Sequence, residues 1–347
     1  MISVRSAGIL RMAAIEQKGD MSSQNPIVSV LIPAYNAEKF IAAAVDSARR
    51  QTLRNIEIII CNDGSSDQTE MILKEIATID PRVKVVNNSG NLGVSSTRNI
   101  MLQNACGRWI AFLDADDLMD SRRLETLVNL GNHHQVDVVI DNLIWINVDA
   151  NKCVGPAVRI ISENLPLSPT TFINRSSTIG FSWGYLQPII RTNWIRQNEI
   201  SFDSQLKIGE DFCFLCSCFI DGATGIFLPE PMYYYRISSQ SATTLRENKG
   251  KYSFEQLITG TQKLLERAKF CGNAEAEAAL HDRVEFLADM LVFSGIVDSM
   301  RTMDIASAVK GMMRLRFRFL KIFFYRVRQK LVWKLQWQFA KPFSLDH

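Results

Sequence analysis

The sequence lacks the long apolar run that a membrane-spanning helix needs. Such a helix takes ~20 mostly apolar residues, and charged or polar residues interrupt every apolar stretch of this 347-residue chain before that length. The apolar patch Ala7 to Leu10, behind Arg5, is too short for the core of a signal peptide. We therefore expect no spanning helix and no secretory signal, and we interpret residues 1–25 as a flexible extension, of which residues 1–20 are dispensable.

Two glycine-rich nucleotide-binding motifs are also missing. No GxGxxG follows a predicted strand, and GxxxxGK[ST] does not occur. In the first motif the glycines let the backbone approach a pyrophosphate, and in the second they cradle a nucleotide triphosphate. Dinucleotide-binding and P-loop proteins are therefore poor matches for this chain.

Cysteine is too sparse and too scattered for a disulfide framework. The seven cysteines are an odd number spread over a long chain. Cys213, Cys216 and Cys218 lie close together, but no further ligand follows at zinc-finger spacing and their neighbours are apolar. We expect them to be small buried residues of a helix, in a protein that works in a reducing cytoplasm.

What is present is an alternation of buried strands and helices. Apolar runs and turn residues predict strands at 28–32, 56–61, 82–87, 109–113 and 136–142, and helices at 36–51, with Asn36 as N-cap, 68–79, 94–105, 254–270 and 274–300. Residues 150–180 have few helix signals and are expected to be irregular. Four strand–helix alternations within about 90 residues indicate βαβ crossovers. The expected fold is α/β with a mixed, mostly parallel sheet.

Polar residues follow three of these strands. Pro33 and Tyr35 come after the first strand, Asp63 after the second, and the cluster from Asp114 to Asp117 after the fourth. Ligands of open α/β sheets bind beyond the carboxyl ends of the strands. Three carboxylates within four residues repel one another unless a cation is present, and hard oxygen ligands suit Mg²⁺ or Mn²⁺. The alternative is an acidic, solvated turn.

Four segments resemble glycosyltransferase family 2, whose members have the GT-A fold. They are PAYNAEKFI, QTLRNIEIIICNDGSSDQT, NLGVSSTRN and GRWIAFLDADD, in this order within residues 27–130. The resemblance implies a nucleotide-sugar donor, with Pro33 and Tyr35 lining the uridine site. It further implies that Asp63 hydrogen-bonds the base and that Arg98 lies beside the nucleotide. Asn62 departs from the family, in which a second Asp is usual at this position.

The same resemblance assigns roles to the acidic cluster and to later motifs. It places Asp114 at the ribose or donor sugar and makes Asp116 the metal ligand, with Asp117 as its second metal residue. Gly209-Glu210-Asp211 resembles the family's ED motif, which makes Asp211 the catalytic base of an inverting transfer and Glu210 an acceptor contact. From the residues alone, this Glu-Asp pair would more simply begin a helix.

Two further segments carry a functional and a structural interpretation each. Trp183, in WGYLQP, could stack on an acceptor sugar or pack in the core. The motif Tyr233-Tyr-Tyr-Arg236 resembles the family's segment that closes over the diphosphate, with Arg236 as a positive charge, although its tyrosines suit a core equally. Gln187 stands where many members have Lys.

The C-terminal region is strongly basic. Residues 301–347 hold eleven Lys and Arg against two Asp and Glu, a charge of +9, which leaves −6 for the rest of a chain whose total is +3. As a helix, residues 310–340 place basic and apolar side chains on different sides, which is typical of a helix in an anionic membrane interface. A strand, because RLRFRF alternates, and packing on the protein body are the alternatives. No nucleic-acid-binding module accompanies the charge, so we expect no nucleic acid partner.

These expectations describe one enzyme. Residues 26–130 form the nucleotide-sugar-binding subdomain, 131–245 the acceptor-binding subdomain, and 246–347 a helical region with the basic tail. The resemblance, which extends to succinoglycan-type exopolysaccharide enzymes, implies transfer of a hexose, glucose from UDP-glucose, to a glycan on polyprenyl diphosphate. The site of action would be the inner face of the cytoplasmic membrane. A non-catalytic carbohydrate- or nucleotide-binding module and a nucleotidyltransferase are the alternatives.

Overall fold

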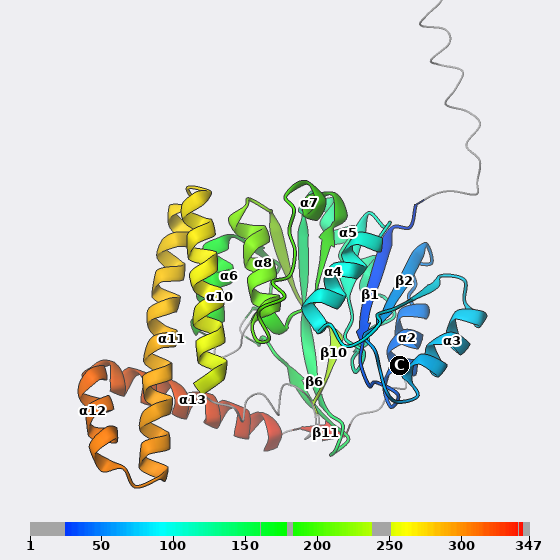
Figure 1. Cartoon of the computed structure of the whole chain (residues 1–347). Coiled ribbons are helices and arrows are strands. Elements are labelled where there is room, and N and C mark those ends of the chain that lie inside the picture. Colours follow the sequence, from blue (N-terminus) through cyan, green and yellow to red (C-terminus); the bar gives the residue numbers. More distant parts are fainter. Residues whose placement is uncertain (1–24, 160, 179–182, 238–250, 339, 343–347) are drawn as a thin grey trace, which may run out of the picture.

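The structure is a computed structural model that describes residues 25–159, 161–178, 183–237, 251–338 and 340–342 (Figure 1). All but the last residue of the expected N-terminal extension lies outside this range. A central sheet carries helices on both faces, and a group of long helices stands at one side. Most buried apolar residues form one continuous core around the sheet.

Four parallel strands make up the first half of the sheet, as the alternation predicts. β4 (Trp109–Phe112), β1 (Val28–Ala34), β2 (Ile56–Asn62) and β3 (Val83–Asn87) are neighbours in this order. The helices α2 (Ile41–Arg49), α3 (Thr69–Ile79) and α4 (Val94–Asn104) connect them. Every residue of β2 and of β4 is buried, because parallel strands are covered by helices on both faces.

The second half of the chain continues the same sheet with mixed directions. β9 (Pro188–Arg191) runs antiparallel between β4 and β6 (Val138–Asn147). β10 (Gly225–Ile237) pairs parallel with β6 and antiparallel with β5 (Leu118–Met119) and β8 (Leu165–Leu167). β7 (Lys152–Pro156) and β11 (Lys341–Pro342) complete the edge. The two expected subdomains thus share one sheet, and its parallel order belongs mainly to the first.

Two expectations about local structure are wrong. Residues 150–180 are not irregular, since they contain β7, β8 and α6 (Pro169–Thr178). The start of α6 had a readable signal, because the Ser168 hydroxyl accepts a hydrogen bond from the Thr171 amide at 3.1 Å and proline occupies the first helical position. Asn36 does not cap α2, which begins at Ile41. Asn36 has φ +48° and accepts from the Ser66 amide at 2.8 Å, so it joins two loops.

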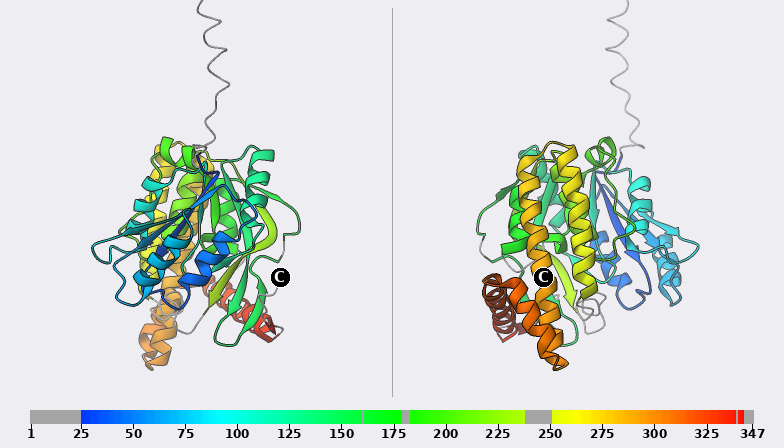
Figure 2. Two further views of the ribbon diagram at one scale, coloured as in Figure 1. Left: turned by 90° about the vertical axis from the view of Figure 1, so that its right-hand side faces the viewer. Right: turned by 60° about the vertical axis from the view of Figure 1, so that its left-hand side comes forward.

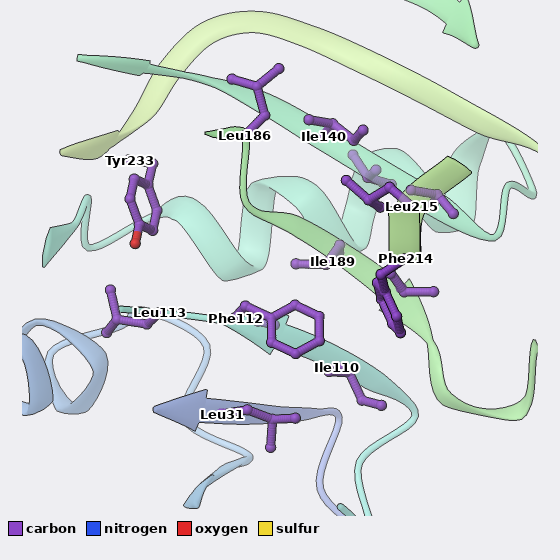
Figure 3. Packing of buried hydrophobic residues seen from close by; sticks show 14 of the residues in the cluster. Leu31, Ile110, Phe112, Leu113, Ile140, Leu186, Ile189, Phe214, Leu215 and Tyr233 are labelled. Atoms are coloured by element: carbon purple, nitrogen blue, oxygen red, sulfur yellow. The ribbon is translucent and has the colours of Figure 1, made fainter. Parts of the chain in front are cut away.

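Shorter helices complete the region around the sheet. They are α5 (Arg123–His133), the 3₁₀ turn η1 (Trp183–Tyr185), α7 (Thr192–Gln197) and α8 (Glu210–Ile220). α8 is almost entirely buried and includes the three clustered cysteines, of which Cys216 and Cys218 are inaccessible and none forms a disulfide. The predicted role as buried helical residues is confirmed for Cys216 and Cys218, whereas Cys213 is partly exposed. Phe214 and Leu215 of α8 pack beside Phe112 of β4 (Figure 3).

The C-terminal region is helical. α10 (Lys251–Phe270) and α11 (Ala274–Arg301) form an antiparallel pair against α6 and α8. α12 (Ile305–Leu315) and α13 (Arg318–Gln338) lie beyond one end of this pair (Figures 1 and 2). RLRFRF is not a strand, because it spans the end of α12, a break at Arg316 with φ +49°, and the start of α13. None of the helices in the described ranges is long and apolar enough to cross a membrane.

Candidate active site

The polar residues that follow β1, β2 and β4 meet at one edge of the sheet. This follows from the strand order, since β4, β1 and β2 are adjacent and parallel and therefore end on the same side. Tyr35 is half exposed there, and Pro33 is partly exposed. The expected nucleotide-binding edge is therefore assembled from three separate loops.

Asp63 holds the loop that leads into α4. Its carboxylate accepts hydrogen bonds from the Asn88 side-chain amide at 2.8 Å and from the amides of Leu92 and Gly93 at 2.8 and 2.9 Å. The residue is 4% exposed. Both of its oxygens have protein partners, so Asp63 is not an open acceptor, and the expected hydrogen bond to a nucleotide base stays a prediction.

Asp114 is held from two sides. Its Oδ1 accepts from Nη2 of Arg98 at 3.0 Å, and its Oδ2 accepts from Nε2 of Gln187 at 3.1 Å. The Gln187 side chain comes from the segment just before β9, so two distant parts of the chain orient one carboxylate. A quarter of the Asp114 side chain remains exposed toward the site.

Asp116 and Asp117 differ strongly in surroundings. Burial, reinforced by the negative charge of Asp114, raises the pKa of Asp116 to about 6. Asp117 is 1% exposed and accepts from the Tyr233 hydroxyl and from the Arg236 amide, both at 2.8 Å. The Tyr233 hydroxyl also accepts from the Asp114 amide at 3.1 Å, and Figure 3 shows it directed toward the chain at Leu113. Asp117 thus connects β10 to the acidic turn through these hydrogen bonds.

A divalent cation fits this acidic turn through Asp116. The raised pKa of Asp116 shows a carboxylate crowded by burial and by a like charge, which a cation would relieve. Within the described ranges no three His, Cys, Asp or Glu side chains converge as a complete protein-built cage. Mg²⁺ commonly takes one or two carboxylates and completes its shell with substrate phosphates and water. The expectation that Asp117 is itself a ligand is not supported, because both of its oxygens are buried and bonded.

Glu210 and Asp211 form the first turn of α8. Gly209 precedes them with φ +80°, a conformation that favours glycine, and a Cβ there would come within 2.6 Å of Leu257 on α10. The Glu210 side chain is 8% exposed, whereas that of Asp211 is 30% exposed. Asp211 lines a small cavity together with Phe112 and Gln187. The helix start expected from the residues alone and the site expected from the resemblance are therefore the same place.

Two sequence-based roles need correction. Arg98 is not an open contact beside a nucleotide, because it is 3% exposed and its guanidinium binds Asp114 and Asp211. Trp183 is fully buried, 4.9 Å from the ring of Phe227 between centroids, so the core alternative holds and it cannot stack on a sugar.

Arg236 is joined to the acidic turn through its backbone amide, which donates to Asp117. Its guanidinium is over the ring of Phe40 at 5.6 Å. Burial lowers the pKa of Arg236, while the charges of Asp117 and Asp116 act in the opposite direction. Arg236 is therefore a cation near Asp116 and Asp117, and its contact with the diphosphate stays a prediction.

Comparison with known proteins decides the family. The model of glycosyl transferase family 2 matches residues 29–194. An uncharacterized glycosyltransferase of Haemophilus influenzae is 43% identical over 230 residues, which cover 63% of this chain and 68% of that protein. The chain belongs to glycosyl transferase family 2. The four motifs quoted above lie in the family's order within the matched region, and the prediction of a glycosyltransferase is confirmed.

Other relatives match at lower sequence identity. Succinoglycan biosynthesis protein ExoO of Rhizobium meliloti is 28% identical over 82% of this chain and 80% of its own length. The Escherichia coli UDP-Glc:alpha-D-GlcNAc-diphosphoundecaprenol beta-1,3-glucosyltransferase WfgD is 36% identical over 38% of this chain. The chain spans 51% of WfgD and 64% of EpsJ, an uncharacterized glycosyltransferase of Bacillus subtilis that is 31% identical over 63% of this chain.

Solved glycosyltransferases share the architecture. S. aureus TarS 1–349 in complex with UDP has a TM-score of 0.55 at 19% identity, covering 83% of this chain and 91% of that one. The Pyrobaculum calidifontis mannosyltransferase PcManGT, in complex with GDP-Man and Mn²⁺, has a TM-score of 0.58 at 14% identity, covering 90% of this chain and 85% of that one. The predicted GT-A fold is confirmed.

Sequence reasoning missed two supports of this glycosyltransferase site. Asn88 binds Asp63, and the Tyr233 hydroxyl joins the Asp114 amide to the Asp117 carboxylate. The Asn88 signal was readable, since it follows a strand beside that of Asp63. The pairing of Tyr233 with Asp117 had no local signal, because the two are 116 positions apart.

Proposed function

We propose that the chain transfers glucose from UDP-glucose to a glycan acceptor with inversion at the anomeric carbon. One observation carries the proposal: a single guanidinium, Arg98, touches both Asp114 at the donor edge and Asp211 at the acceptor side. A base and a donor-sugar contact must be this close for one in-line displacement. UDP in the TarS structure and the glucosyltransferase activity for which WfgD is named support the choice of UDP-glucose.

The reaction uses residues on both sides of this contact. Asp211 takes the proton of the acceptor hydroxyl as its oxygen bonds to the anomeric carbon. The bond from that carbon to the β-phosphate oxygen breaks on the opposite face, and UDP leaves. Asp114 orients the donor sugar, and Glu210 contacts the acceptor. Attack opposite to the leaving group inverts the anomeric centre.

The rest of the site binds the nucleotide and the diphosphate. Pro33 and Tyr35 line the uridine, and Asp63 shapes the loop that contacts the base. Arg236 offers its charge to the diphosphate. Asp116 would hold Mg²⁺ or Mn²⁺, which neutralises charge on the departing diphosphate when bound; Mn²⁺ in the PcManGT structure supports this assignment.

The test is UDP release with a panel of UDP-sugars, in the presence of Mg²⁺ or Mn²⁺, with and without a lipid-linked glycan acceptor. Asp211→Asn should lower kcat by about 10²–10⁴-fold, the usual contribution of a general base, and leave UDP affinity within a few-fold. Glu163→Gln, an exposed carboxylate outside the site, is the matched control. Full transfer by Asp211→Asn, or no binding of any nucleotide sugar by the wild type, would overturn the proposal.

The acceptor is proposed to be a glycan on polyprenyl diphosphate, reached at the inner face of the cytoplasmic membrane during exopolysaccharide or cell-surface polysaccharide synthesis. ExoO and WfgD support this by their names. The membrane contact would be residues 310–340. One apolar face of α13 packs on the protein body. Ile322 of this helix, with Leu315 just before it, is buried in a cluster with residues of α11. Packing on the body therefore accounts for one face of α13 only.

The other face of α13 is exposed and apolar. Leu320, Phe323, Phe324, Val327 and Leu331 follow helical spacing and are each at least 37% exposed. Exposed basic side chains stand between these residues along α13, among them Lys321 and Arg328. An apolar stripe within basic residues suits anionic lipid headgroups above acyl chains.

Vesicle co-sedimentation tests the membrane contact. The double variant Phe323→Ser/Phe324→Ser should bind phosphatidylglycerol-containing vesicles about tenfold more weakly, because two aromatic anchors are lost. Met71→Ser, which removes an exposed apolar side chain on α3, should bind as the wild type does. Equal binding by both variants, or equal binding to neutral vesicles, would refute the contact.

A further inference from the structure

Arg98 is a buried cation among three carboxylates. Its Nη1 lies 2.5 Å from Asp211 Oδ1 and 3.8 Å from Glu210 Oε1, and its Nη2 lies 3.0 Å from Asp114 Oδ1. Burial alone would lower the pKa of this guanidinium, but the three negative charges raise it above its ordinary value. The side chain is therefore a permanent charge within the site.

The two closest carboxylates come from different parts of the chain. Asp114 follows β4 at the donor edge, and Asp211 belongs to α8. The guanidinium is planar and presents donors in a fixed fork. One rigid group thus sets the distance between the proposed donor-sugar contact and the proposed base.

Arg98 is itself firmly placed. Its guanidinium lies over the ring of Phe202, 5.2 Å from the centroid. The adjacent Asn99 exchanges two hydrogen bonds with the backbone of Phe202, at 2.9 and 2.8 Å, and the Ser95 hydroxyl donates to the Leu206 carbonyl at 3.4 Å. Through these contacts α4 is joined to the segment that leads into α8.

The two partners of this ion pair differ in their exposure to solvent. The Arg98 side chain is 3% exposed and that of Asp211 is 30% exposed, so the cation lies beneath the carboxylate and the carboxylate faces outward. A neighbouring positive charge favours the ionised form of a carboxyl group and lowers its pKa. A base placed in this way stays ionised and keeps its orientation.

We infer that Arg98 is a positioning residue that holds Asp211 ionised and aimed at the acceptor hydroxyl. The inference rests on the proposed role of Asp211 as base. Among the residues that the structure describes, Glu210 on α8 and Asp114 after β4 share this guanidinium with Asp211, and both are negative, whereas Arg98 is a charge that favours ionisation of Asp211. On α10, Lys263 is paired with Asp203.

Two variants separate charge from geometry. Arg98→Gln removes the charge, so the acid limb of the kcat–pH profile should move to higher pH by about one unit or more. Arg98→Lys retains a charge but cannot span two carboxylates, so its acid limb should stay near that of the wild type while kcat falls about tenfold. UDP affinity should change less than threefold in both. Arg236→Gln is the control, because it should weaken UDP binding and leave the acid limb in place.

The outcomes distinguish this inference from the proposed function. A purely structural Arg98 would lower the thermal midpoint and leave the acid limb unmoved in Arg98→Gln, and that result would overturn the inference alone. If Arg98→Gln does not fold, an acid limb in Arg98→Lys displaced as far as one unit would equally contradict it. If Asp211→Asn keeps full transfer activity, the proposed base fails first, whatever the Arg98 variants do.

Discussion

Removing the hydroxyl of Tyr233 tests how the acidic turn is held in place. The ring is 1% exposed, and its hydroxyl donates to Asp117 Oδ2 at 2.8 Å while accepting from the Asp114 amide at 3.1 Å. Tyr233→Phe keeps the ring and leaves a buried carboxylate oxygen and a backbone N–H without this partner. A hydrogen bond to a charged group contributes about 1.5–3 kcal/mol and a neutral one about 1 kcal/mol. We expect the free energy of unfolding to fall by about 2–4 kcal/mol.

The loss in free energy of unfolding caused by Tyr233→Phe should increase with pH. Burial raises the pKa of Asp117 well above its ordinary range, with the charges of Asp116 and Asp114 adding to the effect. Removing the Tyr233 donor favours the protonated form further and raises this pKa again. The folded variant therefore keeps the Asp117 proton to higher pH than the folded wild type does. The stability that the variant loses relative to the wild type consequently grows as pH rises from acid. A protonated Asp117 at low pH needs the missing donor least.

Urea unfolding followed by linear extrapolation measures this prediction. Tyr234→Phe is the control on the same strand, because Tyr234 is partly exposed and water can replace its hydroxyl contacts; a change within about 0.5 kcal/mol is expected. Tyr233→Phe should also bind UDP more weakly than the wild type, since the turn that carries Asp116 becomes less firmly held. A loss for Tyr233→Phe no larger than that of Tyr234→Phe would refute the reasoning.

Two other substitutions probe the frame of the site. Asp63→Asn leaves one oxygen where two now accept from Asn88, Leu92 and Gly93; we expect a loss of about 1–3 kcal/mol in urea unfolding and weaker UDP binding by calorimetry, and unchanged UDP affinity would show that the loop does not shape the base site. Gly107→Ala places a Cβ 2.4 Å from the Ser29 backbone nitrogen, so strand β1 must shift; a soluble variant with a wild-type thermal midpoint would contradict this packing.

The sequence was sufficient for the parallel half of the sheet because its signals are local. Each strand there is a short apolar run closed by turn residues, and the boundaries of β2 and α4 agree with the prediction to within one residue. The helix at 36–51 was wrong at its start because Asn36, a good N-cap type, finds partners in the loop of Ser65 and Ser66 instead. The hydrogen bond between Asn36 and Ser66, 30 positions along the chain, therefore outweighs the local preference of Asn36 for a helix N-cap.

The candidate site could be located from the sequence but not resolved into separate tasks. Asp114, Asp116 and Asp117 look equivalent in a row of three carboxylates. They differ because distant residues reach them: Gln187 and Arg98 orient Asp114, while β10 covers Asp117. Such pairings depend on how β9 and β10 enter the sheet, and no spacing within the acidic motif encodes that arrangement.

Gln187 offers a final test of the charge balance in this site. It is 5% exposed, its Nε2 donates to Asp114 at 3.1 Å, and it stands where the family resemblance leads one to expect Lys. Its backbone carbonyl accepts from the guanidinium of Arg123, which is itself paired with Asp141, whereas its neutral side chain contacts the acidic turn. An added cation beside Asp114 would reduce the attraction of the acidic turn for a metal ion.

Gln187→Lys should therefore raise the Mn²⁺ concentration that gives half-maximal UDP release. Charges several ångströms apart near a protein surface interact by about 1–3 kcal/mol, so a shift of about tenfold is expected. Gln187→Met removes the same hydrogen bond without adding charge and should lower kcat while moving the Mn²⁺ requirement less than threefold. If both variants raise the requirement equally, orientation of Asp114 rather than net charge governs the metal, and the neutral residue at this position has no electrostatic role.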